Sequence, residues 1–189
     1  MKYCSHCARP VVVEIPPGDS LPRHVCRHCG RIFYKNPRLV VGTLPRRDGR
    51  ILLCKRSIEP RRGYWTLPCG FMENHETLEE GALRETREEA PADYELGPLH
   101  ALFSLPHVSQ VYAIFLAELR TDEVAAGEET SEVLLVRQDQ IPWPRIAFRA
   151  IEFALQRFCA APEEAGRRVH VGSHASTLSG AWIEAEEDD

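Results

Sequence analysis

The chain contains 189 residues, which allows one full domain with a small appendage. Hydrophobic residues make up 43% and charged residues 27%, so the composition excludes disordered, collagen-like and membrane-embedded chains and predicts a folded core. The formal net charge of −5 hides an asymmetry, because residues 1–68 carry 14 Lys and Arg against 4 Asp and Glu, whereas the remainder carries 9 against 24.

This charge division is compatible with an anionic ligand that reacts beside metal ions held by carboxylates. No stretch approaches the ~18 consecutive apolar residues of a membrane span, and the N-terminus lacks the apolar core of a signal peptide. We therefore expect a cytoplasmic protein without a membrane partner.

Four cysteines near the N-terminus follow the pattern C-x2-C-x18-C-x2-C, namely Cys4, Cys7, Cys26 and Cys29. Two knuckles at this spacing can place four thiolates tetrahedrally around one zinc ion, which predicts a structural zinc ribbon. A pair of disulfides in a secreted module is the alternative, and the missing secretion signal disfavours it. His6, His24 and His28 could replace a ligand, but with four thiolates available we interpret them as surface residues.

Basic and aromatic residues alternate in and just after the ribbon, where Phe33 and Tyr34 lie among Arg23, Arg27, Arg31, Lys35 and Arg38. This mixture is typical of proteins that bind phosphates and stacked bases, which would make RNA a partner. A small ribbon can instead pack its aromatics on a neighbouring domain while its arginines stay solvated. We favour structural support, so nucleic acid is not the expected partner.

A β-hairpin is predicted next, because residues 38–44 and 50–55 are rich in β-forming residues and bracket the turn at 46–49. Pro45 should lie at a strand end or bulge, since an internal proline would remove a ladder hydrogen bond. A polar loop at 57–66 follows, with Arg56, Arg61 and Arg62 in or beside it. These arginines could clamp a phosphate or simply be solvated.

Residues 70–92 (GFMENHETLEEGALRETREEAPA) predict a helix that begins near Leu78, after a capping box, and stops before Pro91. Glu85, Glu88 and Glu89 then share one face of this helix, beside an apolar stripe that can face a sheet. Like charges at this spacing repel, and hard cations such as Mg²⁺ bind carboxylates and substrate phosphates. A highly charged, solvent-facing helix is the alternative.

The remaining sequence predicts strands at 95–104, 110–118 and 132–137 and an amphipathic helix at 146–159. After Cys159 the composition changes, and residues 161–189 resemble a partly disordered tail with an acidic tip. Trp182 and Ile183 in this tail could dock on the domain or on a second subunit of a homodimer.

The segment from Gly70 resembles the Nudix box, G-x5-E-x7-R-E-U-x-E-E-x-G-U, where U is aliphatic. Its charged positions and first glycine match at Gly70, Glu76, Arg84, Glu85, Glu88 and Glu89, whereas Thr86, Pro91 and Ala92 depart from it. The resemblance implies an α+β fold, a Nudix α/β/α sandwich with a mixed sheet, preceded by the small ribbon. The expected division is a ribbon at 1–35, a Nudix hydrolase domain at 36–160 and the tail.

The resemblance also implies site residues. Glu85 and Glu89 would bind Mg²⁺ or Mn²⁺, with a backbone oxygen of Cys69 or Gly70, and Glu88 would bind through water or help to deprotonate the attacking water. Glu76 would orient Arg84, which we count with the catalytic residues, and Glu129 or Glu132 would assist catalysis from a downstream loop. Arg56 and Arg61 would contact phosphate, while Tyr64, Trp65 and Phe71 would stack on a base or pack in the core. A nucleophilic role for Cys69 is disfavoured.

Together the ribbon and box are similar to zinc-ribbon Nudix hydrolases that cleave ADP-ribose or FAD to AMP and a phosphorylated remainder. NADH pyrophosphatases and NAD-decapping enzymes are the alternative, but their SQPWPFP motif is replaced here by FSLPHVSQV at 103–111. The similar IPWP at 141–144 comes two predicted strands too late. A non-catalytic, zinc-ribbon RNA-binding or regulatory protein is the third hypothesis.

Overall fold

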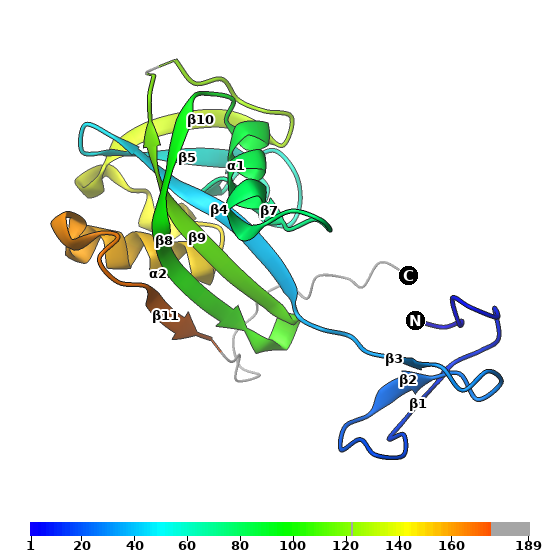
Figure 1. The fold of residues 1–189 in the computed structure, drawn as a ribbon. Helices are drawn as coiled ribbons and strands as arrows, with labels where there is room; N and C mark the ends of the chain where they lie inside the picture. The colour runs from blue at the N-terminus through cyan, green and yellow to red at the C-terminus, as the bar shows by residue number, and fades with distance from the viewer. Residues whose placement is uncertain (122, 175–189) are drawn as a thin grey trace. The chain divides into compact units, whose positions relative to one another are not determined.

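A computed structural model of the chain describes residues 1–121 and 123–174 (Figure 1). These residues divide into two compact units, Met1–Pro37 and the part from Arg38 onward. The predicted contacts of Trp182 and Ile183 lie outside the described residues.

The first unit is a three-stranded antiparallel sheet made of β1 (Val12–Glu14), β2 (Arg23–Val25) and β3 (Ile32–Phe33). Its buried hydrophobic residues are only Cys4, Val25 and Cys26, while Val13 and Ile15 are exposed. So small an apolar core cannot hold a fold together by burial alone, which is why this unit depends on a cross-link through its cysteines.

The second unit is built on an eight-stranded sheet. Its strands are β4 (Arg38–Arg47), β5 (Arg50–Arg56), β6 (Trp65–Thr66), β7 (Cys69–Phe71), β8 (Tyr94–Leu105), β9 (Gln110–Leu119), β10 (Thr130–Arg137) and β11 (His170–Ser173). The main order is β10-β5-β4-β9-β8-β11, with β6 paired to β5 and β7 paired to β4. The pairs β4–β9 and β8–β11 are parallel and the others antiparallel, so the sheet is mixed as expected.

Two α-helices, α1 (Leu78–Glu89) and α2 (Arg149–Ala160), cover opposite faces of this sheet (Figure 1). Successive residues of β4 show the division, because Val41 packs in a cluster with Ala82 of α1, whereas Val40 packs in a cluster with Leu155 of α2. Side chains alternate between the faces of a strand, so one strand serves both layers. The α/β/α sandwich of the α+β class is therefore confirmed. Short 3-10 turns lie at Pro106–Val108, Gln138–Gln140, Trp143–Arg145 and Pro162–Glu164.

Helix α1 has the boundaries that its sequence predicts. The Thr77 hydroxyl accepts a hydrogen bond from the Glu80 N–H (3.2 Å), and the Glu80 carboxylate accepts one from the Thr77 N–H (2.8 Å). At the other end, the Glu89 carbonyl accepts the Gly127 N–H (2.9 Å), and the Ala90 carbonyl accepts the Tyr94 hydroxyl (2.6 Å). These donors satisfy the last carbonyl groups of the helix. The glycine that the Nudix box has at the position of Pro91 is therefore not needed to end it.

The hairpin between β4 and β5 turns at Asp48 and Gly49, both with positive φ. The prediction for Pro45 is wrong, because Pro45 lies inside β4 opposite Ala117 of β9. The Thr43 N–H points away from β9 and donates to the Pro68 carbonyl. Because the strand repeats every two residues, the backbone nitrogen of Pro45 also points away from β9. On that side the ladder with β7 ends at Gly42 and the ladder with β5 covers only Arg46 and Arg47, so proline removes no ladder bond.

Two further predictions near the C-terminus need correction. Helix α2 begins at Arg149 rather than at 146, because the Ala147 N–H donates to the Trp65 carbonyl (2.8 Å) and keeps this segment beside β6. The segment assigned to a tail contains β11, which extends the sheet at the edge of β8. Its residues alternate poorly in hydrophobicity, so the sequence carried no clear strand signal.

A buried pair of threonines joins α1 to the sheet. Thr86 occupies an aliphatic position of the box and is fully buried, as is Thr43 of β4. The Thr86 hydroxyl donates to the Ala82 carbonyl (2.6 Å), which leaves the Thr43 hydroxyl to donate to Thr86 Oγ1 (2.8 Å). The departure from the box is thus accommodated by a hydrogen-bonded chain in the core.

We predict that Thr86→Val lowers the free energy of unfolding by about 1–3 kcal/mol, because it leaves the Thr43 donor buried without a partner. Thr43→Val should cost less, since Thr86 still donates to Ala82. The double variant should recover part of the loss. Urea unfolding of the four proteins measures this, and equal costs for the two single variants would contradict it.

Candidate functional site

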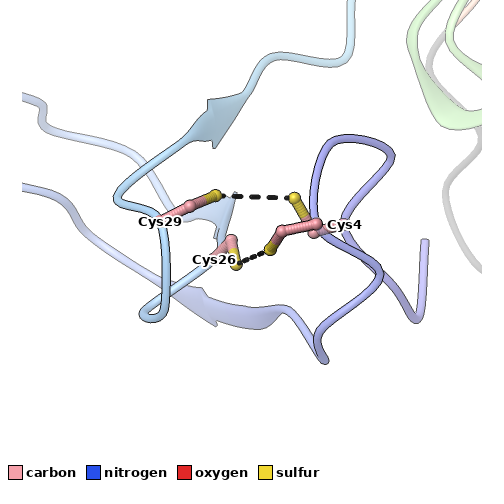
Figure 2. Close-up of side chains that lie close together, drawn as sticks. Cys4, Cys26 and Cys29 are labelled. Atoms are coloured by element: carbon pink, nitrogen blue, oxygen red, sulfur yellow. Dashed lines mark hydrogen bonds between the residues drawn. The ribbon is translucent and has the colours of Figure 1, made fainter.

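The four predicted zinc ligands converge in the first unit. The sulfur atoms of Cys4, Cys7, Cys26 and Cys29 all lie within 4.8 Å of one another. Cys4 Sγ is 3.7 Å from Cys29 Sγ (Figure 2). Cys7 Sγ is 3.5 Å from Cys26 Sγ. Four sulfurs bound to one tetrahedral zinc at ~2.3 Å would be separated by about 3.8 Å, so the cluster fits this ion. Disulfide bonds do not fit, since they require sulfur atoms about 2.05 Å apart.

Backbone N–H groups complete the two knuckles. The His6 N–H donates to Cys4 Sγ (3.4 Å), and Ala8 and Gly30 adopt positive φ where each knuckle turns. A hydrogen bond from the Cys29 backbone lowers the pKa of Cys26 to about 6, which favours the thiolate that binds metal. Among the described residues, no histidine joins this cluster.

Two arginines of the ribbon are paired within it. Arg23 Nε lies 2.9 Å from Asp19 Oδ2, and its guanidinium lies 5.0 Å from the centre of the Tyr34 ring. Arg27 forms an ion pair with Glu14. These internal partners favour the structural interpretation of the basic residues over phosphate binding.

In the second unit, Arg84 connects α1 to the loop that precedes it. Its Nε and Nη2 donate to the two carboxylate oxygens of Glu76 (2.9 and 2.8 Å), and this bidentate pairing lowers the pKa of Glu76 to about 2. Nη1 donates to Glu85 Oε1 (2.6 Å), and Nη2 also donates to the Phe71 carbonyl (3.1 Å). The predicted contact between Glu76 and Arg84 is present, and Glu85 is oriented through the same guanidinium.

Gly70 allows the Glu85 carboxylate to lie directly against β7. A Cβ atom at position 70 would lie only 2.1 Å from Glu85 Oε2, so any other residue would displace this carboxylate. The backbone of Gly70 therefore borders the Glu85 side chain, and the Cys69 backbone donates a hydrogen bond to Glu89. This proximity is compatible with a cation shared by a carboxylate and a backbone carbonyl.

The three box glutamates differ in exposure. The side chain of Glu88 is 60% exposed and that of Glu85 is 13% exposed, whereas Glu89 is 8% exposed. Burial raises the pKa of Glu89 to about 8, although Arg56 acts in the opposite direction. Burial also raises the pKa of Glu85 against the effect of Arg84. Partly desolvated carboxylates near each other are stabilised by a divalent cation, so these residues fit one.

The structure separates the two loop glutamates. Glu129 lies in the loop that contacts the end of α1, and its charge is a minor contribution to the raised pKa of Glu85 and of Glu89. Glu132 instead lies opposite Lys55 in the β10–β5 ladder and forms a 3.0 Å ion pair with it.

The loop that carries Glu129 is held by Gly127. A Cβ at position 127 would lie 1.7 Å from the Glu88 carbonyl oxygen, so only glycine allows this approach. The Ser57 N–H then donates to the Glu129 carbonyl (2.9 Å). These two contacts fix the loop beside the C-terminal end of α1.

The predicted substrate-binding residues form two groups. Arg56 affects Glu89 electrostatically, and its guanidinium lies 5.0 Å from the Phe148 ring centre. The guanidinium groups of Arg61 and Arg145 lie 5.3 and 5.6 Å from the Tyr64 ring centre. Arg145 and Phe148 were missed by sequence analysis, because the chain returns to this loop only in the folded sheet.

The other two predicted aromatics have different surroundings. Trp65 packs against the main core cluster, which limits the ring face that a base could use. Phe71 is 44% exposed, and Arg38 lies 4.4 Å from its ring centre. Cys69 is buried, and desolvation raises the pKa of its thiol well above the ordinary value. A neutral thiol is a poor nucleophile, in agreement with the interpretation that Cys69 does not attack the substrate.

Comparison with protein families identifies the class. The family described as NUDIX domain matches residues 36–154, and the family described as Nudix N-terminal, a zinc ribbon, matches residues 2–35. The chain belongs to the Nudix hydrolase family and carries its N-terminal zinc ribbon.

Individual relatives support the assignment to the Nudix hydrolase family. An ADP-ribose pyrophosphatase from Methanocaldococcus jannaschii is 31% identical over 61% of this chain and 70% of that protein. An NAD-capped RNA hydrolase from Chromobacterium violaceum is 42% identical over 47% of this chain, which spans only 31% of that longer protein. A Nudix hydrolase structure from Nitrosomonas europaea is 48% identical, with a TM-score of 0.88 over 92% of this chain and 99% of that one.

Among the residues described by the structure, no helix is long and apolar enough to cross a membrane.

We predict that Cys26→Ser releases the ribbon metal, because the remaining three thiolates no longer complete a tetrahedral site. Metal analysis should find about one zinc per wild-type chain and much less in the variant. Cys159→Ser, at a cysteine outside the cluster, serves as the control and should keep the zinc. Retention of a full equivalent by Cys26→Ser would contradict the prediction.

A second prediction concerns pH. The pKa of Glu89 rises from 4.5 to about 8 on folding, so between these values the folded state binds more protons than the unfolded state. With zinc retained and no other divalent cation, stability should therefore fall as pH increases from 6 to 8. Glu89→Gln cannot ionise and should flatten this dependence. Urea unfolding at both pH values tests it, and parallel slopes for the two proteins would refute it.

Proposed function

We propose that the protein hydrolyses the diphosphate of a nucleoside diphosphate linked to another group, with ADP-ribose as first candidate, releasing AMP and a phosphorylated remainder. One observation carries the proposal most directly. Glu85 and Glu89 lie one turn apart on α1, the loop that carries Glu129 contacts the end of that helix, and Arg84 and Arg56 supply positive charge to these carboxylates. Carboxylates that can hold cations, next to an arginine, are suited to a substrate that contains phosphates.

The choice of ADP-ribose follows from the relatives. The M. jannaschii ADP-ribose pyrophosphatase is matched over 70% of its length, the larger share of the two named enzymes. FAD enters only through the family resemblance and is the second compound to test.

Each residue has a proposed role. Glu85 and Glu89, with a carbonyl oxygen of Cys69 or Gly70, would hold Mg²⁺ or Mn²⁺, which when bound neutralises the diphosphate and lowers the pKa of water. The exposed Glu88 is suited to contact through water. Arg84 positions Glu85 rather than the substrate, since its donors are occupied by Glu76, Glu85 and Phe71.

Glu129 is the proposed general base. It comes from a separate loop that contacts the end of α1, and its charge acts on Glu85 and Glu89, so it could accept a proton from the attacking water while those two residues hold cations. Glu132 is paired with Lys55 and is not proposed for this role.

Hydrolysis of NADH or of an NAD-linked RNA end is the second candidate. The 42% identity to the C. violaceum enzyme over 88 residues favours it. The same bond type would be cleaved, so the two candidates differ in the group attached to the nucleoside diphosphate.

The deciding experiment is product analysis with Mg²⁺ or Mn²⁺ and, separately, ADP-ribose, FAD and NADH. We expect AMP from ADP-ribose, loss of product in Glu89→Gln, and a reduction of kcat by about 10²–10⁴ in Glu129→Gln. Glu132→Gln is the matched control and should stay within about threefold of the wild type.

The outcomes separate the candidates. Preference for NADH would select the second one. Cleavage of none of the three compounds would reject the proposed function, and equal losses in Glu129→Gln and Glu132→Gln would reject Glu129 as the base.

A further inference from the structure

One aromatic ring, that of Phe148, lies against an arginine that supplies positive charge to the candidate active site. The guanidinium carbon of Arg56 is 5.0 Å from the centre of this ring, within the range of a cation–π contact. Arg56 Nε also donates a hydrogen bond to the Pro60 carbonyl (2.7 Å). Two separate parts of the chain therefore hold this guanidinium, one at its face and one at Nε.

The two terminal nitrogens of Arg56 are left for a ligand. Within residues 1–121 and 123–174, neither Nη1 nor Nη2 has a hydrogen-bond partner, and no carboxylate forms an ion pair with Arg56. Together these nitrogens form the paired edge with which a guanidinium contacts two oxygens of a phosphate.

The charge of Arg56 acts on the groups that border the candidate metal site. Burial raises the pKa of Glu89, and the charge of Arg56 is the largest influence that opposes this rise. Burial and the charge of Glu89 raise the pKa of Cys69, and Arg56 opposes them there as well. A diphosphate held by cations at Glu85 and Glu89 would therefore meet the positive charge of Arg56.

Phe148 occupies a position where helices usually carry a different kind of residue. It is the N-cap of α2, where Ser, Thr, Asp and Asn are favoured because their side chains accept a helix N–H, and it accepts none. The half-buried ring instead packs against the main core cluster, which fixes its position beside Arg56. The Ala147 N–H, bonded to the Trp65 carbonyl, holds the preceding backbone next to β6. The contact with Arg56 gives a reason for an aromatic residue at this N-cap.

We propose that Phe148 is a positioning residue for the substrate diphosphate, which holds the Arg56 guanidinium so that Nη1 and Nη2 face the phosphate oxygens. A long arginine side chain has many rotamers, and a ring against one face removes part of this freedom before the substrate binds. Phe148 acts through Arg56 and does not itself touch the substrate. This inference rests on the proposed function and describes how its site binds the diphosphate.

The test is a double-variant cycle with ADP-ribose as substrate. Phe148→Leu should raise KM about three- to tenfold and leave kcat within about twofold, because Arg56 then spends less time in the binding orientation. Arg56→Gln should raise KM about 10- to 100-fold. The double variant should match Arg56→Gln, since the ring acts only through the guanidinium. Phe148→Tyr keeps the ring and should restore the wild-type KM.

Phe153→Leu is the matched control. Phe153 is another half-buried ring of α2 that packs against the same core cluster, and it lies 5.1 Å from the guanidinium carbon of Arg157. Both leucine variants should lower stability in urea unfolding, but only Phe148→Leu should raise KM. Phe148→Met removes the ring with a more adaptable side chain and gives the same comparison if Phe148→Leu folds poorly.

Failure of the inference can be distinguished from failure of the proposed function. If substrate is cleaved but Phe148→Leu has the KM of Phe153→Leu, or if Phe148→Leu still raises KM in the Arg56→Gln background, the inference is wrong. Calorimetric binding of inorganic pyrophosphate with Mg²⁺ gives a readout that does not depend on turnover.

The binding measurement decides the case in which ADP-ribose, FAD and NADH are all left intact. If Phe148→Leu then weakens pyrophosphate binding and Phe153→Leu does not, the proposed function is wrong and the positioning role stands. If the wild type binds no pyrophosphate, or if the wild type and both leucine variants bind it equally, the positioning role is overturned as well.

Discussion

The arrangement of the candidate active site depends on the contacts of one guanidinium group. Arg84 lies in the middle of α1 and donates to Glu76 in the preceding loop, to Glu85 on the same helix and to the Phe71 carbonyl at the end of β7. The loop before α1, α1 itself and the end of β7 are therefore held together before any ligand binds. A lysine could not replace this side chain, because its single ammonium cannot form the planar, bidentate contact with Glu76.

We expect the site to lower the stability of the unliganded fold. Glu89 is buried near Glu85 and Glu129, so its ionised form is opposed by desolvation and by like charge. No gain in packing explains such a grouping of carboxylates on the surface of a helix. Cations bound as proposed would neutralise this grouping and make it favourable, which is the usual relation between a preorganised site and the stability of its scaffold.

Local signals in the sequence predicted the parts of the structure that depend on local geometry. The cysteine spacing predicted the cluster in the ribbon, and the capping box at Thr77 predicted the start of α1, because each involves residues a few positions apart. The sequence could not distinguish Glu129 from Glu132, since the choice depends on Gly127 contacting the end of α1. Arg145 was missed for the same reason: its partner, Tyr64, is 81 positions away and is reached through the sheet.

Strand β11 affects how the chain can be shortened. It pairs in parallel with β8, and a Cβ atom at Gly172 would lie 2.8 Å from the Phe153 ring of α2. The family match ends at residue 154, before this strand. A protein truncated at that boundary would lose the second half of α2, with the core residues Leu155 and Phe158, and would expose the backbone donors and acceptors of β8 along a free edge, where strands of other chains can add. Aggregation of such a truncated protein would therefore reflect an uncovered sheet edge and an opened core, and would not report on the catalytic residues.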